Sequence, residues 1–221
     1  AFRLVEQLGN LAREDVKDEV KQLDQEARGS LRRYGIRFGA FNIFIPTLLK
    51  PAPTELKLML WALQEQQAGR LEAGMVPEAP PQGLTSVALT PGGRQDFYHI
   101  AGFRVCGSRA VRIDMIERLA DLIRPRVFWK PQSEGDVRPQ GSVEGGGFTV
   151  IPDMMSLVGC SGEEFAGILR ALGFRSEKRK VPSAVAADKA PEASVAGETG
   201  EAVPAETGET TAMNEVSACP A

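Results

Sequence analysis

The chain has 221 residues, a formal net charge of −3 and 43% hydrophobic residues, which allows one or two domains with a sizeable core. Its longest apolar stretch, Ala40 to Leu49, is too short and too interrupted to span a bilayer. Three widely spaced cysteines and one histidine argue against both a four-ligand zinc site and a disulfide framework. We therefore expect a soluble, cytoplasmic protein without a metal site.

The charge is unevenly distributed along the chain. From Asp188 onward, seven acids and one base sum to −6, which leaves +3 for residues 1–187. From about Pro182 the sequence consists mostly of Ala, Glu, Pro, Thr, Gly and Val, with no aromatic residue. Such a segment buries too little surface to offset its ordering entropy. We expect residues 182–221 to form a disordered, low-complexity acidic tail.

The first helical signals lie near the N-terminus. Val16, Val20, Leu23 and Ala27 recur at steps of four, three and four residues, which places them on one helical face. Alternatively, Asp24 caps a separate helix that runs to Arg33. Both readings remain open at this point.

Three further helices are expected downstream. The first begins after Thr54, which reads as its N-cap, and carries a stripe, a row of apolar residues that is expected to face the core. The second carries another such apolar row. The third has a capping box at its start and Gly173 at its C-terminal end. The residues are Leu56, Met59, Leu60 and Leu63 in the first stripe, Ile113, Ile116, Ala120 and Ile123 in the second, and Ser161, Glu164, Phe165, Ile168, Leu169 and Leu172 in the last helix.

Strand signals are short. Residues 84–89 and 103–106 are candidate strands, and 148–151 and 174–175 could pair around the last two helices. Two loops rich in Gly and Pro, at 69–83 and 131–147, mark possible sub-boundaries. The expected fold is mainly α with minor β, a helical domain over residues 1–181 followed by the tail.

No catalytic pattern stands out. The chain has no GxxxxGK[ST] phosphate loop and no DExH-type acidic box. The run Gly145 to Gly147 is followed by Phe148 rather than by Lys, so it reads as a loop. His99, the only histidine, reads as a partly buried structural residue. We expect no catalytic residue and no cofactor in this chain.

Two basic clusters remain as candidate nucleic-acid contacts, because clustered arginines with nearby aromatic residues can hold phosphates and stack bases. The alternative is a solvated face over an aromatic core, with Arg112 pairing an acid on the surface. We expect Arg109 and Arg112 to lie on the middle helix. The candidate RNA-binding residues are Arg32, Arg33, Arg37, Arg109 and Arg112.

Residues 33–51, RYGIRFGAFNIFIPTLLKP, resemble a segment that follows the motor domains in one helicase family. Stretches at 2–6, 102–107, 109–114, 147–150 and 157–162 resemble its bacterial members in the same order. This is the ATP-dependent RNA helicase family of the mitochondrial RNA-degrading complex and its alphaproteobacterial relatives, superfamily-two enzymes of the DExH type. The resemblance covers about residues 2–176.

The resemblance implies that the chain is the C-terminal accessory part of such a helicase. It would pack on upstream motor domains of the same parent protein and help to guide RNA. ATP and Mg²⁺ would be bound by those motor domains, which carry the hydrolase motifs. The alternatives are a non-enzymatic RNA- or protein-binding module and a purely structural domain.

We predict that this chain alone neither binds nor hydrolyses ATP, because it lacks a phosphate loop with its lysine. The measurement is phosphate release by the purified chain with and without single-stranded RNA. RNA-stimulated release that stays with the chain through successive purification steps would contradict the prediction.

Overall fold

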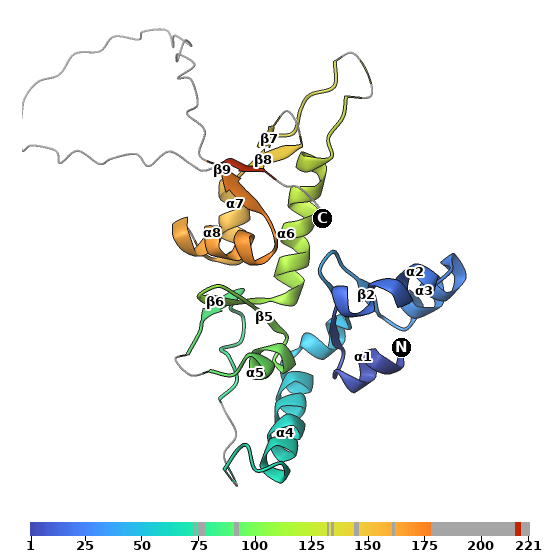
Figure 1. Cartoon of the computed structure of the whole chain (residues 1–221), viewed down its shortest axis with the longest axis vertical. Coiled ribbons are helices and arrows are strands. Elements are labelled where there is room, and N and C mark those ends of the chain that lie inside the picture. The colour runs from blue at the N-terminus through green and yellow to red at the C-terminus, as the bar shows by residue number, and fades with distance from the viewer. Residues whose placement is uncertain are drawn as a thin grey trace, which may run out of the picture.

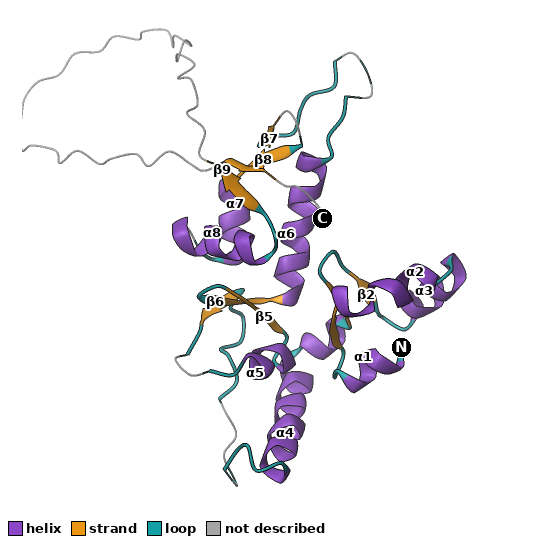
Figure 2. Cartoon of the chain, viewed as in Figure 1, coloured by secondary structure: helices purple, strands orange, loops and turns teal. Residues whose placement is uncertain are grey.

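The computed structural model describes residues 1–72, 74, 78–90, 93–131, 133, 135–143, 146–160 and 162–177, and the backbone of 215–217. About 49% of the structure is helix and 16% is strand, so the fold is mixed α/β rather than mainly α. Three small sheets follow one another along the chain, each with its own helices (Figures 1 and 2). We name the three parts the N-terminal module (1–45), the middle module (46–112) and the C-terminal module (113–177).

The N-terminal module holds an antiparallel sheet of order β1-β3-β2. Asp24 ends one helix and starts the next, because its Oδ1 accepts the backbone N–H of Ala27 at 2.7 Å. The capped-helix alternative is therefore confirmed, and a single helix over 16–27 is wrong. The elements are α1 (Phe2–Glu6), β1 (Asn10–Ala12), the 3-10 helix η1 (Glu14–Val16), α2 (Lys17–Gln22), α3 (Gln25–Arg33), β2 (Arg37–Phe38) and β3 (Asn42–Phe44).

The middle module packs two helices on a sheet of order β4-β6-β5. Trp61 and Phe97 belong to one core cluster, so the loop 69–83 connects two elements of the same core. The strands expected within 84–89 and at 103–106 are confirmed. The elements are η2 (Pro46–Leu49), α4 (Pro51–Gln67), β4 (Ser86–Ala88), α5 (Gln95–Ile100), β5 (Phe103–Cys106) and β6 (Arg109–Arg112).

The C-terminal module contains the largest core cluster. The predicted stripe from Ile113 to Ile123 is buried, and so are the apolar residues of the last helix, which confirms both faces. Ser161 of the expected capping box lies outside the described residues. The elements are α6 (Ile113–Val127), β7 (Ser142–Val143), β8 (Gly147–Thr149), α7 (Pro152–Val158), α8 (Gly162–Ala171) and β9 (Arg175–Glu177).

A short strand from the far C-terminus joins the last sheet. β10 (Glu215–Ser217) pairs antiparallel with both β8 and β9, so the order is β7-β8-β10-β9. The sequence predicts that β8 and β9 pair with each other, but β10 lies between them. The predicted disorder over 182–221 otherwise concerns residues outside the described part of the chain.

The apolar stripe predicted on α4 is the clearest error. The helix begins at Pro51 rather than after Thr54, and it buries its opposite side through Leu58, Trp61 and Ala62. The four predicted core residues are about half exposed, at 55%, 49%, 49% and 55%. We call this uncovered set the α4 stripe: Leu56, Met59, Leu60 and Leu63.

A buried carboxylate ties the N-terminal module to α6. Glu117 is 8% exposed, and its side chain accepts the backbone N–H groups of Ala40, Phe41 (3.0 Å) and Asn42 (2.7 Å). A Cβ at Gly39 would lie 2.2 Å from the Glu117 carboxyl carbon, so this close approach requires glycine. Burial raises the pKa of Glu117 against the opposing effect of the three N–H donors. We call this contact the Glu117 clamp.

A second polar contact joins the N-terminal and middle modules. His99 Nε2 lies 3.1 Å from the carbonyl oxygen of Asn10, and Asn10 Nδ2 lies 3.2 Å from His99 Nδ1. A neutral ring protonated at Nε2 satisfies both contacts. Burial lowers the pKa of His99, which favours this neutral form. His99 is therefore a structural residue, as predicted.

We predict that Glu117→Gln destabilises the chain by about 2–4 kcal/mol, because an amide NH₂ group would face N–H donors that need an acceptor. Urea unfolding followed by circular dichroism measures the change. Asp121→Asn, on the exposed side of the same helix, is the control and should change stability by no more than about 0.5 kcal/mol. Equal stability of the two variants would contradict the importance of the clamp.

Candidate nucleic-acid interface

Three of the five predicted RNA contacts gather at the end of α3 and on β2. Arg32 and Arg33 occupy the last turn of α3, and Arg37 begins β2. All three side chains are exposed. The guanidinium of Arg32 lies 5.9 Å from the centroid of the Phe38 ring, a cation–π distance. We call these three residues the N-terminal arginines.

The N-terminal arginines are free to meet a ligand. Within the described part of the chain, the side chains of Arg33 and Arg37 make no hydrogen bond or ion pair. Tyr34, between them, is 80% exposed. Arg28 differs, because its Nη2 donates to the carbonyl oxygen of Val20 at 2.8 Å and so ties α3 to α2. The surface thus offers unpaired positive charge beside an open aromatic ring, which suits a phosphate with an adjacent base.

The other two predicted contacts lie elsewhere and are already paired. Arg109 and Arg112 are on β6 rather than on a helix. Arg109 Nη1 lies 3.1 Å from Glu164 Oε1, and its side chain is only 17% exposed. Its Nε donates to Ser86 Oγ at 3.1 Å. This arginine therefore holds α8 against the middle sheet.

Arg112 forms a bidentate ion pair. Its Nε and Nη2 lie 2.6 Å and 2.9 Å from the two carboxylate oxygens of Asp114, so the alternative reading, in which Arg112 pairs an acid on the surface, describes this geometry. The predicted set therefore divides into three unpaired arginines on the N-terminal module and two neutralised arginines on β6.

Arg104, which belongs to the second basic cluster but is not among the five candidate residues, makes a different contact. Its guanidinium lies 5.6 Å from the centroid of the Phe41 ring, and none of the described carboxylates pairs with it. The two residues are 63 positions apart in the sequence. No local pattern in the chain signals such a contact, because it depends on how the N-terminal and middle modules pack.

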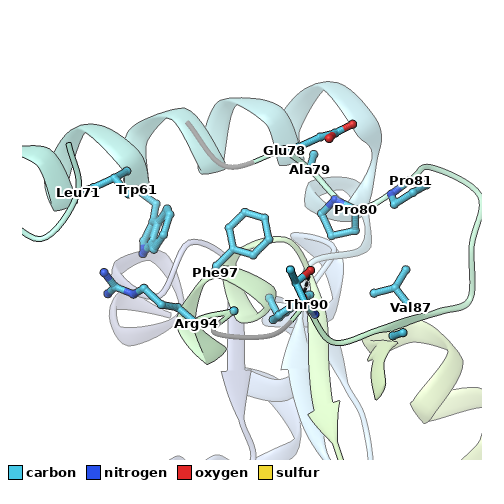
Figure 3. Close-up of a pocket in the computed structure, with 13 residues that line it drawn as sticks. Trp61, Leu71, Glu78, Ala79, Pro80, Pro81, Val87, Thr90, Arg94 and Phe97 are labelled. Carbon is cyan, nitrogen blue, oxygen red and sulfur yellow. Dashed lines mark hydrogen bonds between the residues drawn. The ribbon is translucent and has the colours of Figure 1, made fainter. Parts of the chain in front are cut away.

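The middle module also holds a cavity of about 560 Å³ between α4, α5 and β4. Rings and apolar side chains make up most of its lining, among them Trp61, Phe97 and Pro80 (Figure 3). Arg94 stands 5.2 Å from the centroid of the Trp61 ring. The lining residues that the structure describes offer no pair of a nucleophile and a base, so their chemistry is that of an apolar pocket.

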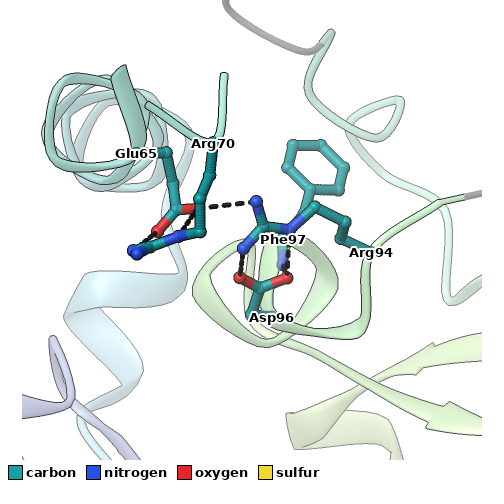
Figure 4. A network of polar contacts seen from close by, with 5 residues as sticks. All are labelled: Glu65, Arg70, Arg94, Asp96 and Phe97. Atoms are coloured by element: carbon teal, nitrogen blue, oxygen red, sulfur yellow. Dashed lines mark hydrogen bonds and ion pairs between the residues drawn. The ribbon is translucent and has the colours of Figure 1, made fainter. Parts of the chain in front are cut away.

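Arg94 of the cavity lining belongs to a network of ion pairs (Figure 4). Glu65 on α4 accepts from Arg70 Nε at 2.8 Å and pairs with Arg94 Nη1 at 2.6 Å. Arg94 also pairs with Asp96 at the start of α5. The hydrogen bond from Arg70, supported by Arg94, lowers the pKa of Glu65 to about 2. These arginines are engaged in linking α4 to α5.

The two described cysteines, Cys106 and Cys160, have thiols whose pKa is raised. Cys106 is 1% exposed, and burial raises the pKa of its thiol to about 11, so the thiol stays protonated at neutral pH. The pKa of Cys160 is also raised by burial. Over the described ranges, no group of three or more His, Cys, Asp or Glu side chains is placed to hold a metal ion.

Comparisons with known protein families, with curated proteins and with solved structures found no match to this chain. The described helices include none that is both long and apolar enough to cross a membrane. The geometry of the chain's own residues therefore carries the functional argument.

We predict that changing the three N-terminal arginines to alanine weakens binding of single-stranded RNA about equally for unrelated sequences. Each lost phosphate contact flattens the salt slope by about 0.7, so the slope should fall by about 2. Filter binding at about 50 and 200 mM salt measures both quantities.

The matched control removes three exposed arginines from helices of the C-terminal module, namely Arg118, Arg124 and Arg170. Because the net charge changes equally in both variants, a loss confined to the N-terminal set locates the interface. An equal effect of both triple variants would contradict this location.

Proposed function

We propose that this chain is the C-terminal accessory part of an ATP-dependent RNA helicase. In this role it packs against the motor domains of the same parent protein in the cytoplasm and helps to guide RNA. The motor domains would bind ATP and Mg²⁺ and hydrolyse the nucleotide. The resemblance of residues 33–51 to a segment that follows such motors supports the assignment.

The observation that carries the docking half of the proposal is the exposed α4 stripe. Its members stand at positions i, i+3, i+4 and i+7 of one helix, which is the spacing with which amphipathic helices anchor in an apolar groove. Four large apolar side chains that are each about half exposed form a contiguous patch of the kind that marks a contact surface.

The neighbours of the stripe narrow the type of partner. Gln64 and Gln67, which lie on the exposed side of α4 beyond the stripe, are uncharged. The charged residues Lys57 and Glu65 are buried on the other side of the helix. One exposed carboxylate, Glu55, lies beside Met59 and accepts from Gln82 Nε2 at 3.2 Å. The stripe itself is apolar, so its partner must offer apolar area. Such an interface suits a domain that stays attached in the same protein.

The RNA half of the proposal rests on the N-terminal arginines and Tyr34. Unpaired guanidinium groups bind phosphates without regard to sequence, and an exposed ring can stack an unpaired base. This combination suits guiding a strand more than reading it. The arginines lie on the N-terminal module and the stripe on the middle module, so docking and RNA contact can take place together.

We predict that Leu60→Glu weakens binding of this chain to the separately purified motor domains of its parent protein at least about tenfold, because a buried unpaired carboxylate is costly. Since Leu60 is about half exposed here, its own free energy of unfolding should change by only about 0.5 kcal/mol. Isothermal titration calorimetry measures the first quantity and urea unfolding the second.

Val137→Glu is the control, because Val137 is an exposed apolar residue, at 89%, on another part of the chain. It introduces the same charge and should leave binding unchanged. If native chain and motor domains form no complex, the docking role fails, and RNA binding by the chain alone would then favour an independent RNA-binding module. If neither binding is detectable, a purely structural domain is the remaining reading.

A further inference from the structure

A polar cleft of about 340 Å³ lies where the N-terminal module meets the middle module. Its volume is in the range of small-ligand sites, about 300–1,000 Å³. Four elements build it: β1 and β3 on one side, and α5 with β5 on the other. The side chains that matter for the argument are Asn42, Asp96, His99 and Arg104.

The cleft is held rigid by contacts on both sides. The Glu117 clamp fixes the backbone of Asn42. The Asn42 amide Nδ2 donates to Asn10 Oδ1 at 3.3 Å, and Asn10 in turn is bonded to His99 across the module boundary. A site fixed before its ligand arrives loses less entropy on binding.

Two groups of the cleft have no hydrogen-bond partner among the described residues. Arg104 stacks on Phe41, which leaves the N–H groups in the guanidinium plane free to donate. Asn42 is 2% exposed, and its Oδ1 is buried without a hydrogen bond, so this oxygen lies within the wall of the cleft and not on its surface. The cleft therefore presents one fork of donors, that of Arg104.

The described lining of the cleft holds one unpaired cation and no cluster of cations. The carboxylate of Asp96 also lines it and is paired with Arg94, so a phosphate would find only Arg104 to pair with. A neutral ring that carries two adjacent acceptors along one edge matches the fork of Arg104. Nucleobases are neutral rings with acceptors on their edges, and an unpaired base of single-stranded RNA exposes all its edges.

Guanine fits the donor set best among the four bases. Its O6 and N7 are adjacent acceptors that an arginine fork can bind in bidentate fashion. The geometry points to this cleft as a site for a single unstacked guanine of an RNA strand, bound by Arg104. The inference rests on the proposed RNA-guiding function and adds a base-reading site to it.

The test compares short uridine oligonucleotides that differ only at one central position, which carries guanosine, adenosine or uridine. Fluorescence anisotropy with the full chain should give roughly tenfold tighter binding for the guanosine strand. Arg104→Ala should remove this preference and bring the guanosine strand to the affinity of the uridine strand. Arg124→Ala, which removes the same charge from an exposed position on α6, should keep the preference.

Two further arms separate this inference from the proposed function. Changing the three N-terminal arginines to alanine should weaken all strands alike and leave the guanosine preference intact. If no strand binds at all, the RNA-guiding function fails, and titration with guanosine monophosphate followed by NMR then decides the cleft alone. Amide shifts at Asn42 and Arg104 that vanish in Arg104→Ala would support the cleft as a site for the free nucleotide.

The proposed site is overturned by equal affinity for the three strands, by a guanosine preference that survives Arg104→Ala, or, where no strand binds, by the absence of shifts with the free nucleotide. Thermal unfolding of Arg104→Ala by circular dichroism checks that the variant is folded. If it is not, Arg104→Lys replaces it, because lysine keeps the charge but lacks the planar fork. Loss of the preference in that variant supports the site, and its retention overturns it.

Discussion

The Glu117 clamp sets the arrangement on which the rest of the structure depends. One carboxylate accepts three consecutive backbone N–H groups of the β2–β3 loop, so it fixes the course of the loop without any of the loop's side chains. The course of the loop positions two side chains. The ring of Phe41 stacks under the guanidinium of Arg104, and the amide of Asn42 donates a hydrogen bond to Asn10. A displaced loop would therefore disturb the module boundary and the polar cleft together.

The modules need such contacts because each is small. Sheets with strands of two to four residues are weak by themselves and depend on helices packed against them. The N-terminal and middle modules have separate apolar clusters, whereas the largest cluster also includes Cys106 and Val111 of the middle module. The boundary between the N-terminal and middle modules is joined by the polar contacts of Asn10 with His99. Directional hydrogen bonds define one relative position more sharply than apolar packing does, since a misplaced buried donor or acceptor is costly.

The sequence predicted α3 and α6 because local rules decide them. Asp24 is a strong N-cap, and the apolar residues of α6 lie on a single face. On α4 the rules fail, since apolar residues occur on two faces, and periodicity cannot tell which face is buried. Strands such as β2 have only two residues, too few for any periodicity. The pairing of Arg109 with Glu164 joins residues 55 positions apart, so the sequence could not separate paired arginines from free ones.

The exposed apolar face of α4 is itself a structural signal of a partner. A helix that buries Leu58, Trp61 and Ala62 has met its own packing needs, so the apolar α4 stripe has no role in the stability of the described fold. Exposed leucines and methionine at helical spacing carry a risk of aggregation. A partner surface removes that risk, and it accounts for both apolar faces at once. The helix thus joins two interfaces, one inside the middle module and one toward the motor domains that we propose.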